Sequence, residues 1–284
     1  MPQQLLELGG PADAALIHIA PANSFPPQTY APMLRSLRDR YRAICFPPRA
    51  LWGDQTPPRE LREWHVLADD LLRAFDRWKM DELILIGHSF GGIASMLAAI
   101  KAPERFRALI MLDPTILSRE GLDWLKTATD RNALDQSPLV RGALRRRRVF
   151  ESRDLAFARF RDRPHFADWP DEALRLYVDH GLRERPGTAG YELAWPVEWE
   201  VYYYSTVYQR VWEDLPKLEG LLPVLIIRGS ASDTFDQASQ DAVQRLAPAA
   251  TIIVIEGQGH LFPQSAPDET GALIRSWLGT ALSQ

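Results

Sequence analysis

The chain has 284 residues, of which 46% are hydrophobic and 25% charged, a composition typical of a globular protein with one large or two smaller domains. A net charge of −4 argues against a nucleic-acid partner, and no run of about 20 apolar residues could span a membrane. The single cysteine, Cys45, excludes a disulfide within the chain and a thiolate zinc site. Residues 1–4 lack the positive charge of a signal peptide, so we expect a cytoplasmic location.

Six short apolar runs are predicted to be strands buried on both faces of a parallel sheet, because they are rich in Ile and Val and end in turn residues. These runs are Ala15–Ile19, Arg42–Phe46, Leu83–Ile86, Ala108–Leu112, Val224–Ile227 and Thr251–Ile255. Amphipathic segments long enough for helices lie between most of them, namely Tyr30–Arg40, Leu61–Trp78, Gly91–Lys101 and Gln237–Leu246. This alternation predicts an α/β fold with a mostly parallel, doubly wound sheet flanked by helices.

The alternation stops between about Leu117 and Leu215. This stretch is rich in Arg and Trp and has several helical patterns but no convincing strand, and the strand pattern resumes after it. We therefore expect a helical cap, residues 117–215, inserted into a core formed by residues 1–116 and 216–284.

Three features of the expected cap bear on its role. A helix could begin at Pro196, since an apolar stripe runs from Val197 to Leu215. The run Arg145–Arg148 is interpreted as a solvated helix face. Aromatic residues either seat the cap on the core or line a pocket for an apolar acyl or alcohol group, and the pattern favours neither. These residues are Trp124, Trp169, Trp195, Trp199, Trp212 and Tyr202 to Tyr204.

The segment Gly87-His88-Ser89-Phe90-Gly91 lies between a predicted strand and a predicted helix. In this setting G-x-S-x-G indicates a strained turn that presents a nucleophilic serine, here Ser89, above the sheet. The glycines leave room for the close approach of helix and strand. The N–H of Phe90, at the positive end of the helix, is a candidate oxyanion donor. His88 is expected to have a packing or hydrogen-bonding role.

A serine hydroxyl needs a base, and histidine suits that role near neutral pH. Of the six histidines, only His260 follows the last predicted strand, in a loop rich in glycine. Its position at the carboxyl edge of the sheet would allow it to reach the turn of Ser89. His260 is therefore the predicted base.

A carboxylate must orient the second nitrogen of the imidazole. Asp233 follows the strand Val224–Ile227 and is the preferred acid. With it, the three residues follow one another along the chain as Ser, Asp and His, an order in which catalytic triads are known to occur. Asp236 is a weaker candidate. Asp113 is the main alternative because it ends the strand Ala108–Leu112 at the same edge, although it could instead cap the turn before Pro114.

With these motifs, the sequence resembles the α/β-hydrolase family, in particular its cap-bearing esterase-like and lipase-like members. The resemblance rests on residues 87–92, 229–233 and 257–260. The sequence departs from the family pattern at the first loop of the catalytic face. Where family members usually have His-Gly, residues 18–25 are His-Ile-Ala-Pro-Ala-Asn-Ser-Phe.

The departure affects the second oxyanion donor, because Pro21 has no N–H. We expect the donor to be the backbone of Ala22 or Asn23. Ala20 and the side-chain amide of Asn23 are alternatives. His18 is expected to order this loop.

The predicted reaction is acyl transfer: Ser89 attacks, His260 accepts the proton, an acyl-enzyme forms and water releases it. A serine nucleophile argues against haloalkane dehalogenase and epoxide hydrolase chemistry, which use a carboxylate in this fold. No metal motif is present, and neither a metal nor any other cofactor is expected. The expected substrate is a small carboxylic ester with an apolar group. A C–C bond hydrolase with the same triad, or a small-ligand receptor of this fold, is the alternative. The oligomeric state is not predicted.

Overall fold

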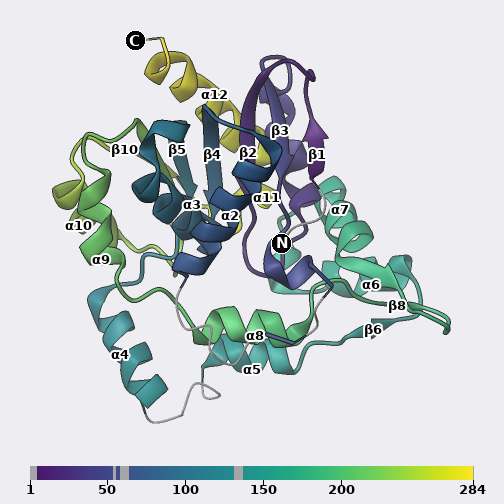
Figure 1. The fold of residues 1–284 in the computed structure, drawn as a ribbon. Coiled ribbons are helices and arrows are strands. Elements are labelled where there is room, and N and C mark those ends of the chain that lie inside the picture. The colour runs from purple at the N-terminus through teal and green to yellow at the C-terminus, as the bar shows by residue number, and fades with distance from the viewer. Residues whose placement is uncertain (1–4, 54–55, 58–63, 131–136, 284) are drawn as a thin grey trace.

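The computed structural model describes residues 5–53, 56–57, 64–130 and 137–283. Its centre is a seven-stranded sheet with the strand order β1-β3-β2-β4-β5-β9-β10 (Figure 1). All neighbours in this sheet run parallel except β1 and β3. The strands are β1 (Leu6–Gly9), β2 (Ala15–Ala20), β3 (Tyr41–Cys45), β4 (Leu83–His88), β5 (Phe106–Leu112), β9 (Val224–Gly229) and β10 (Thr251–Ile255). The mostly parallel sheet confirms the predicted fold class.

Apolar residues alternate between the two faces of the sheet, and each face has its own core. In β4, Leu83 and Leu85 pack on one side, while Ile84 and Ile86 pack on the other. Such strands carry almost no polar residue, because both of their faces are shielded from water. The sequence therefore reads as continuous apolar runs, and this is why the central strands were predictable.

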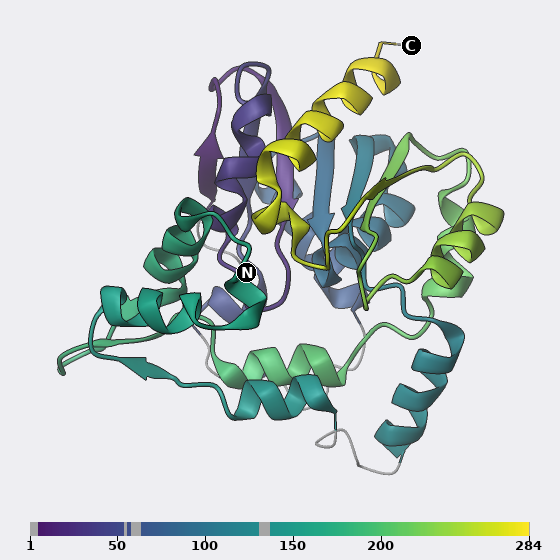
Figure 2. The same ribbon diagram turned by 180° about the vertical axis from the view of Figure 1, so that it is seen from behind.

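Helices cover both faces (Figure 2). On one face lie α2 (His65–Trp78), α3 (Phe90–Lys101) and α10 (Gln237–Leu246), and on the other α1 (Ala31–Leu34), α11 (Phe262–Ser265) and α12 (Pro267–Ala281). The segment predicted as one helix over Tyr30–Arg40 is instead the short α1 flanked by 3-10 turns. Residues 61–63 of the second predicted helix lie outside the described residues. Neither β1 nor α12 was predicted.

Residues 117–215, here called the insert, lie between β5 and β9 in the chain. The parallel strands point towards the insert (Figures 1 and 2). It contains α4 (Arg119–Asp130), α5 (Pro138–Leu144), α6 (Arg153–Arg161), α7 (Asp171–Gly181), α8 (Val197–Ser205) and α9 (Val211–Asp214). A small antiparallel sheet, which the sequence did not indicate, joins β6 (Val149–Phe150), β8 (Tyr191–Leu193) and β7 (Leu182–Glu184).

The expected helix from Val197 to Leu215 is interrupted between α8 and α9. The interruption contains Tyr208, whose hydroxyl donates to the Asp214 carboxylate and lies 2.9 Å from Nε2 of His65 at the start of α2. These contacts with α2 and α9 replace continued helix, so a tertiary interaction overrides the helical pattern.

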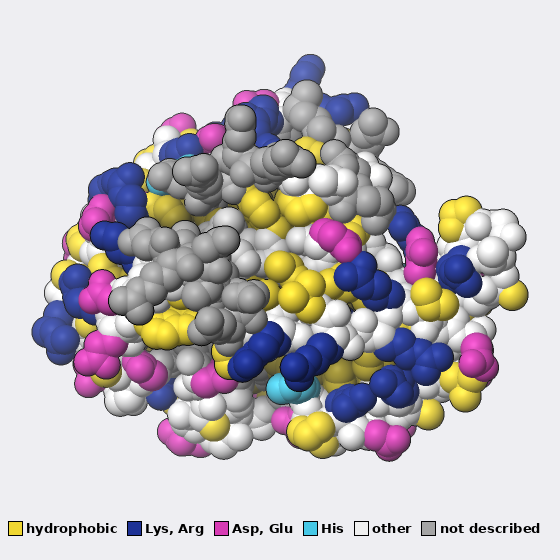
Figure 3. All heavy atoms as spheres, turned by 90° about the horizontal axis from the view of Figure 1, so that it is seen from below, with side chains coloured by type: hydrophobic (Ala, Val, Ile, Leu, Met, Phe, Trp, Pro, Cys, Tyr) yellow, Lys and Arg dark blue, Asp and Glu magenta, His cyan; other side chains and the backbone are white. Residues whose placement is uncertain are grey.

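The Arg145–Arg148 run is only partly a solvated face. Arg145, Arg147 and Arg148 are exposed, but the side chain of Arg146 turns inward and pairs with Glu200. Several Lys and Arg side chains gather on this side of the molecule (Figure 3). Within the described ranges, no helix is long and apolar enough to cross a membrane.

Candidate active site

Ser89 occupies the sharp turn between β4 and α3. Its backbone has φ 58° and ψ −123°, and residues other than glycine rarely adopt a positive φ. A Cβ on Gly87 would lie 2.3 Å from the carbonyl oxygen of Gly91, and one on Gly91 would lie 2.2 Å from that of Ala20. Both positions therefore require glycine, as predicted from the five-residue pattern.

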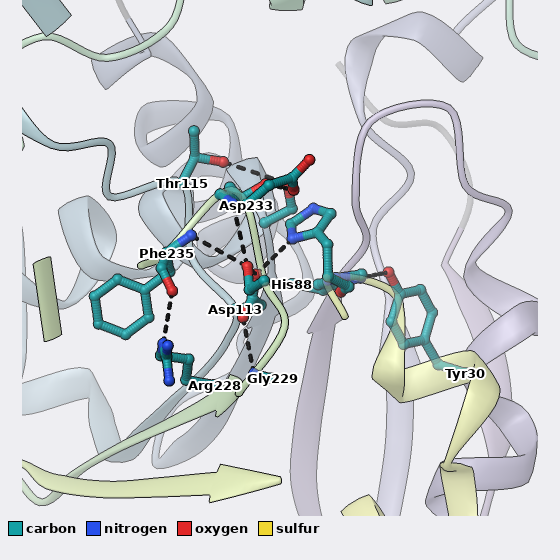
Figure 4. Close-up of polar contacts among 12 residues, drawn as sticks. Tyr30, His88, Asp113, Thr115, Arg228, Gly229, Asp233 and Phe235 are labelled. Carbon is teal, nitrogen blue, oxygen red and sulfur yellow. Dashed lines mark hydrogen bonds and ion pairs between the residues drawn. The ribbon is translucent and has the colours of Figure 1, made fainter. Parts of the chain in front are cut away.

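His260 pairs with Asp113 across the carboxyl edge of the sheet. The Nδ1 atom of His260 lies 2.7 Å from Oδ2 of Asp113, which is fully buried at the end of β5. The carboxylate also accepts hydrogen bonds from the Ser232 hydroxyl and, over 3.1 Å, from the N–H of Gly229 (Figure 4). A buried carboxylate held in this way can fix the imidazole's tautomer and stabilise its cation.

The expected approach of Asp233 to His260 does not occur. Asp233 is exposed, its side chain extends away from Asp113 (Figure 4), and its carboxylate accepts a bond from the neighbouring Thr234 hydroxyl. The tight turn after β9 directs Ser232 inward and the next side chain outward. Asp236, the weaker candidate, caps α10 by accepting from the N–H of Ser239.

Thr115 is a neighbour of the nucleophile that sequence reasoning missed. Its hydroxyl lies 3.3 Å from Oγ of Ser89, and its N–H donates to the Ser89 carbonyl over 3.3 Å. The Ser89 N–H in turn donates to the carbonyl of Leu112. The chain just after β5 therefore holds the turn from the side. The available signal was the strand order, which places the end of β5 beside the end of β4.

The candidate oxyanion donors differ in whether they already have a partner. Phe90 is the first residue of α3, so its N–H has no acceptor within the helix. The N–H of Ala22 donates to the hydroxyl of Tyr30 over 2.9 Å, which contradicts the expectation that it is free. The side-chain amide of Asn23 is also engaged, since it donates to the carbonyl of Glu200 over 3.0 Å.

His18 belongs to β2, where it is fully buried. Its Nε2 accepts a hydrogen bond from the Phe46 N–H, and its ring stacks on Phe46 and meets the edge of Phe75. Burial lowers its pKa from 6.5 to about 3, so the imidazole is neutral near pH 7. His18 thus orders the chain after β3 rather than the loop that follows β2.

The insert contacts the loop after β2 through a buried ion pair. Glu200 of α8 pairs with Arg146 at 2.7 Å, and both also bind the Ser24 hydroxyl. Arg146 additionally donates to the hydroxyl of Tyr177 in α7. Since removal of one partner from a buried pair leaves an uncompensated charge, these contacts fix the insert against the loop that contains Asn23.

The aromatic residues of the insert fall into two groups. Trp195, Trp199 and Tyr203 are buried, and Tyr203 packs on Phe90 with 4.9 Å between ring centroids. They seat the insert on the core, whereas Trp124 is half exposed. A separate cavity of about 110 Å³ lies between the insert and the loop after β2. Its lining is mainly apolar and includes Pro26, Pro27, Phe160, Leu182 and Trp195, together with Ser24 and Arg146.

The described residues contain no cluster of three or more His, Cys, Asp or Glu side chains that could hold a metal ion. The hydroxyl of Thr115 lies beside Ser89, and the Asp113–His260 pair is at the end of the neighbouring strand.

A model of the alpha/beta hydrolase family matches residues 16–273. The 2-(acetamidomethylene)succinate hydrolase of Mesorhizobium japonicum is 25% identical over 88% of this chain and 82% of its own length. The esterase YbfF of Escherichia coli is 25% identical over 78% of each chain. The crystal structure of E-2-(acetamidomethylene)succinate hydrolase has a TM-score of 0.76 and 21% identity, and the match covers 97% of this chain and 94% of the other.

Proposed function

Because the chain belongs to the alpha/beta hydrolase family, we propose that it is a serine hydrolase with Ser89 as nucleophile, His260 as base and Asp113 as acid. The observation that carries the proposal is the Asp113–His260 pair, at 2.7 Å, beside the strained turn of Ser89. A buried carboxylate bound to Nδ1 leaves Nε2 to accept the serine proton. Asp113 replaces Asp233, the acid that the sequence favoured.

In the proposed reaction, Ser89 attacks a carboxylic ester and its proton passes to His260. The developing oxyanion is bound by the N–H of Phe90 and by the backbone N–H of Asn23, since the N–H of Ala22 already has an acceptor. The alcohol leaves with the proton from His260, and water then releases the acid from the acyl-enzyme. Each oxyanion donor contributes about 3 kcal/mol to lowering the barrier.

We further propose that the insert acts as a cap and that the cavity under it takes the apolar part of the substrate. This is supported by the apolar lining of the cavity and by its position beside the loop after β2. For p-nitrophenyl esters, kcat/KM should then rise by about fourfold for each added methylene, from about 0.8 kcal/mol per buried CH₂, until the cavity is full. A diketone substrate assayed in parallel tests the alternative of C–C bond cleavage.

The nucleophile is tested with a fluorophosphonate probe. The wild-type protein should be labelled on Ser89 and lose its esterase activity in proportion. Ser89→Ala should show no labelling and lose about 10⁶-fold in kcat, the effect of removing such a nucleophile in other serine hydrolases. A folded wild-type protein that is not labelled would contradict the proposal.

A further inference from the structure

A buried chain of hydrogen bonds runs through His88, the residue before the proposed nucleophile. The hydroxyl of Tyr30, which is fully buried at the end of the 3-10 turn Pro27–Tyr30, accepts from the N–H of Ala22 over 2.9 Å. The same hydroxyl lies 2.7 Å from Nδ1 of His88 (Figure 4). On the far side of its ring, Nε2 of His88 lies 2.9 Å from the carbonyl oxygen of His260. The chain thus joins the loop after β2 to the loop of the base.

The two ends of this chain fix the direction of every bond in it. The carbonyl of His260 can only accept, so Nε2 of His88 must carry the hydrogen. Nδ1 of His88 is then a lone pair, and it takes the hydrogen of the Tyr30 hydroxyl. The oxygen of that hydroxyl remains free to accept from Ala22. One tautomer therefore satisfies all four groups, whereas the other would place the lone pair of Nε2 against the carbonyl oxygen of His260.

The surroundings keep His88 in this neutral form. The side chain is 1% exposed. Burial, together with the nearby His260, holds the pKa of His88 well below its usual range. Its ring lies 5.0 Å from that of His260, so the two imidazoles are direct neighbours. A neutral, single-tautomer imidazole is a rigid connector rather than a second base.

We propose that Tyr30 and His88 are positioning residues that hold the loop after β2, which supplies the proposed Asn23 donor, and the loop of His260 at a fixed separation. The inference rests on the proposed function and extends it to residues that do not touch the substrate. His260 is then held twice, through its carbonyl by His88 and through Nδ1 by Asp113. Ala22 is held through its N–H, which leaves the N–H of Asn23 for the oxyanion. This one chain of hydrogen bonds therefore fixes the position of the proposed oxyanion donor and that of the proposed base.

The first test is Tyr30→Phe, which removes the hydroxyl and keeps the ring. We expect kcat to fall by about tenfold or more with little change in KM, because small displacements of catalytic groups are costly in rate. The rate of inactivation by a fluorophosphonate should fall by the same factor, since that reaction uses the same base and oxyanion donors. Tyr41→Phe is the matched control. Tyr41 is the first residue of β3 and so lies at the amino ends of the parallel strands, away from Ser89 at their carboxyl ends. Its variant should keep wild-type kcat.

A second pair of variants separates the two ends of the His88 ring. His88→Gln places its amide nitrogen near the former Nε2, so it can still donate to the His260 carbonyl. His88→Asn is too short to reach that carbonyl and can only replace the Nδ1 acceptor. The inference predicts that His88→Gln retains a higher kcat than His88→Asn at equal thermal stability. The acidic limb of the pH–rate profile should also move in His88→Asn, because the base loses its backbone anchor.

The outcomes are distinguishable from a failure of the proposed function. If the wild-type protein is not labelled at Ser89, the proposed function fails first. If it is labelled and Tyr30→Phe keeps wild-type kcat and inactivation rate, the positioning role is overturned, even where the melting temperature falls. Equal kcat for the Gln and Asn variants of His88 would likewise overturn the role of the His260 contact.

Discussion

The turn after β4 and the loop after β9 lie at the same edge of the sheet, two strands apart, and are held in different ways. In the turn, Gly87 and Gly91, two positions before and after Ser89, allow the close approach that gives the turn its shape, and the chain after β5 supports it from the side. In the loop, Gly229 and Ser232 are held by Asp113, which follows β5 and lies more than a hundred positions away. The shape of the turn depends on glycines that lie beside Ser89 in the sequence, so a local pattern indicates where Ser89 points. The loop after β9 depends on a distant carboxylate, so its own sequence does not indicate which side chain points inward.

The largest effect that separates the two regions is expected at the carboxylates. Asp113→Asn should lower kcat by about 10⁴-fold, as loss of the orienting carboxylate does in other triads. Asp233→Asn, its matched control, should stay within about twofold, because Asp233 is exposed and its carboxylate accepts a hydrogen bond from the Thr234 hydroxyl. Both are measured by steady-state kinetics with a short p-nitrophenyl ester. A larger loss at Asp233 than at Asp113 would reverse the assignment of the acid.

The same contrast explains how much could be predicted from the sequence. The buried parallel strands, the turn of Ser89 and the position of His260 follow from local patterns, namely apolar runs, paired glycines and a loop after the last strand. The pairing of His260 with Asp113 depends on whether the loop after β5 or the loop after β9 directs its carboxylate towards His260. No local sequence pattern indicates which of the two does so. Tyr30 is a similar case, since a tyrosine after two prolines carries no signal that its hydroxyl reaches His88.

A second prediction concerns acid stability near the turn of β4. His18 pairs in register with Leu85 of β4 and has a pKa lowered to about 3, against 6.5 when unfolded. The folded state thus binds fewer protons than the unfolded state between these values. The stabilisation is complete above pH 6.5 and is lost as the pH falls towards 3, by about 5 kcal/mol.

The check is urea unfolding at several pH values. His18→Gln keeps an acceptor for the Phe46 N–H but does not titrate, so its free energy of unfolding should depend less on pH over this window. The exposed His165 serves as the control position, and His165→Gln should follow the wild-type curve. Identical pH slopes for His18→Gln and the wild type would show that His18 is not the group responsible.

The third prediction concerns the turn itself. Gly91→Ala places a methyl group against the carbonyls of Ala20 and Pro21, at 2.2 and 2.6 Å, where the backbone must move. We expect the free energy of unfolding to fall by about 3 kcal/mol. Gly279→Ala in α12 meets nothing within 4 Å and should be neutral or stabilising by up to about 1 kcal/mol. If the two variants are equally stable in urea, the turn tolerates a methyl group at position 91, and its shape does not depend on glycine there.

The smallest effect is expected in the loop after β9, at Ser232. Its hydroxyl donates to Asp113 and accepts from the N–H groups of Thr234 and Phe235, so it both orients the acid and shapes the turn. Ser232→Ala should lower kcat by about tenfold, the value of one hydrogen bond to a charged group. KM should not change, because Ser232 lies behind Asp113 rather than at the substrate.

Two further variants decide whether Ser232 acts through Asp113. Ser232→Thr keeps the hydroxyl and should recover most of the lost kcat. Thr234→Val removes a neighbouring hydroxyl that donates to the exposed Asp233 and not to Asp113, so it should keep wild-type kcat. A shift in the acidic limb of the pH–rate profile of Ser232→Ala, absent from Thr234→Val, would show that the hydroxyl tunes the acid–base pair. If Ser232→Ala lowered the free energy of unfolding and left kcat unchanged, the Ser232 hydroxyl would stabilise the loop without orienting Asp113. The loop after β9 would then differ from the turn of Ser89 in having no part in catalysis.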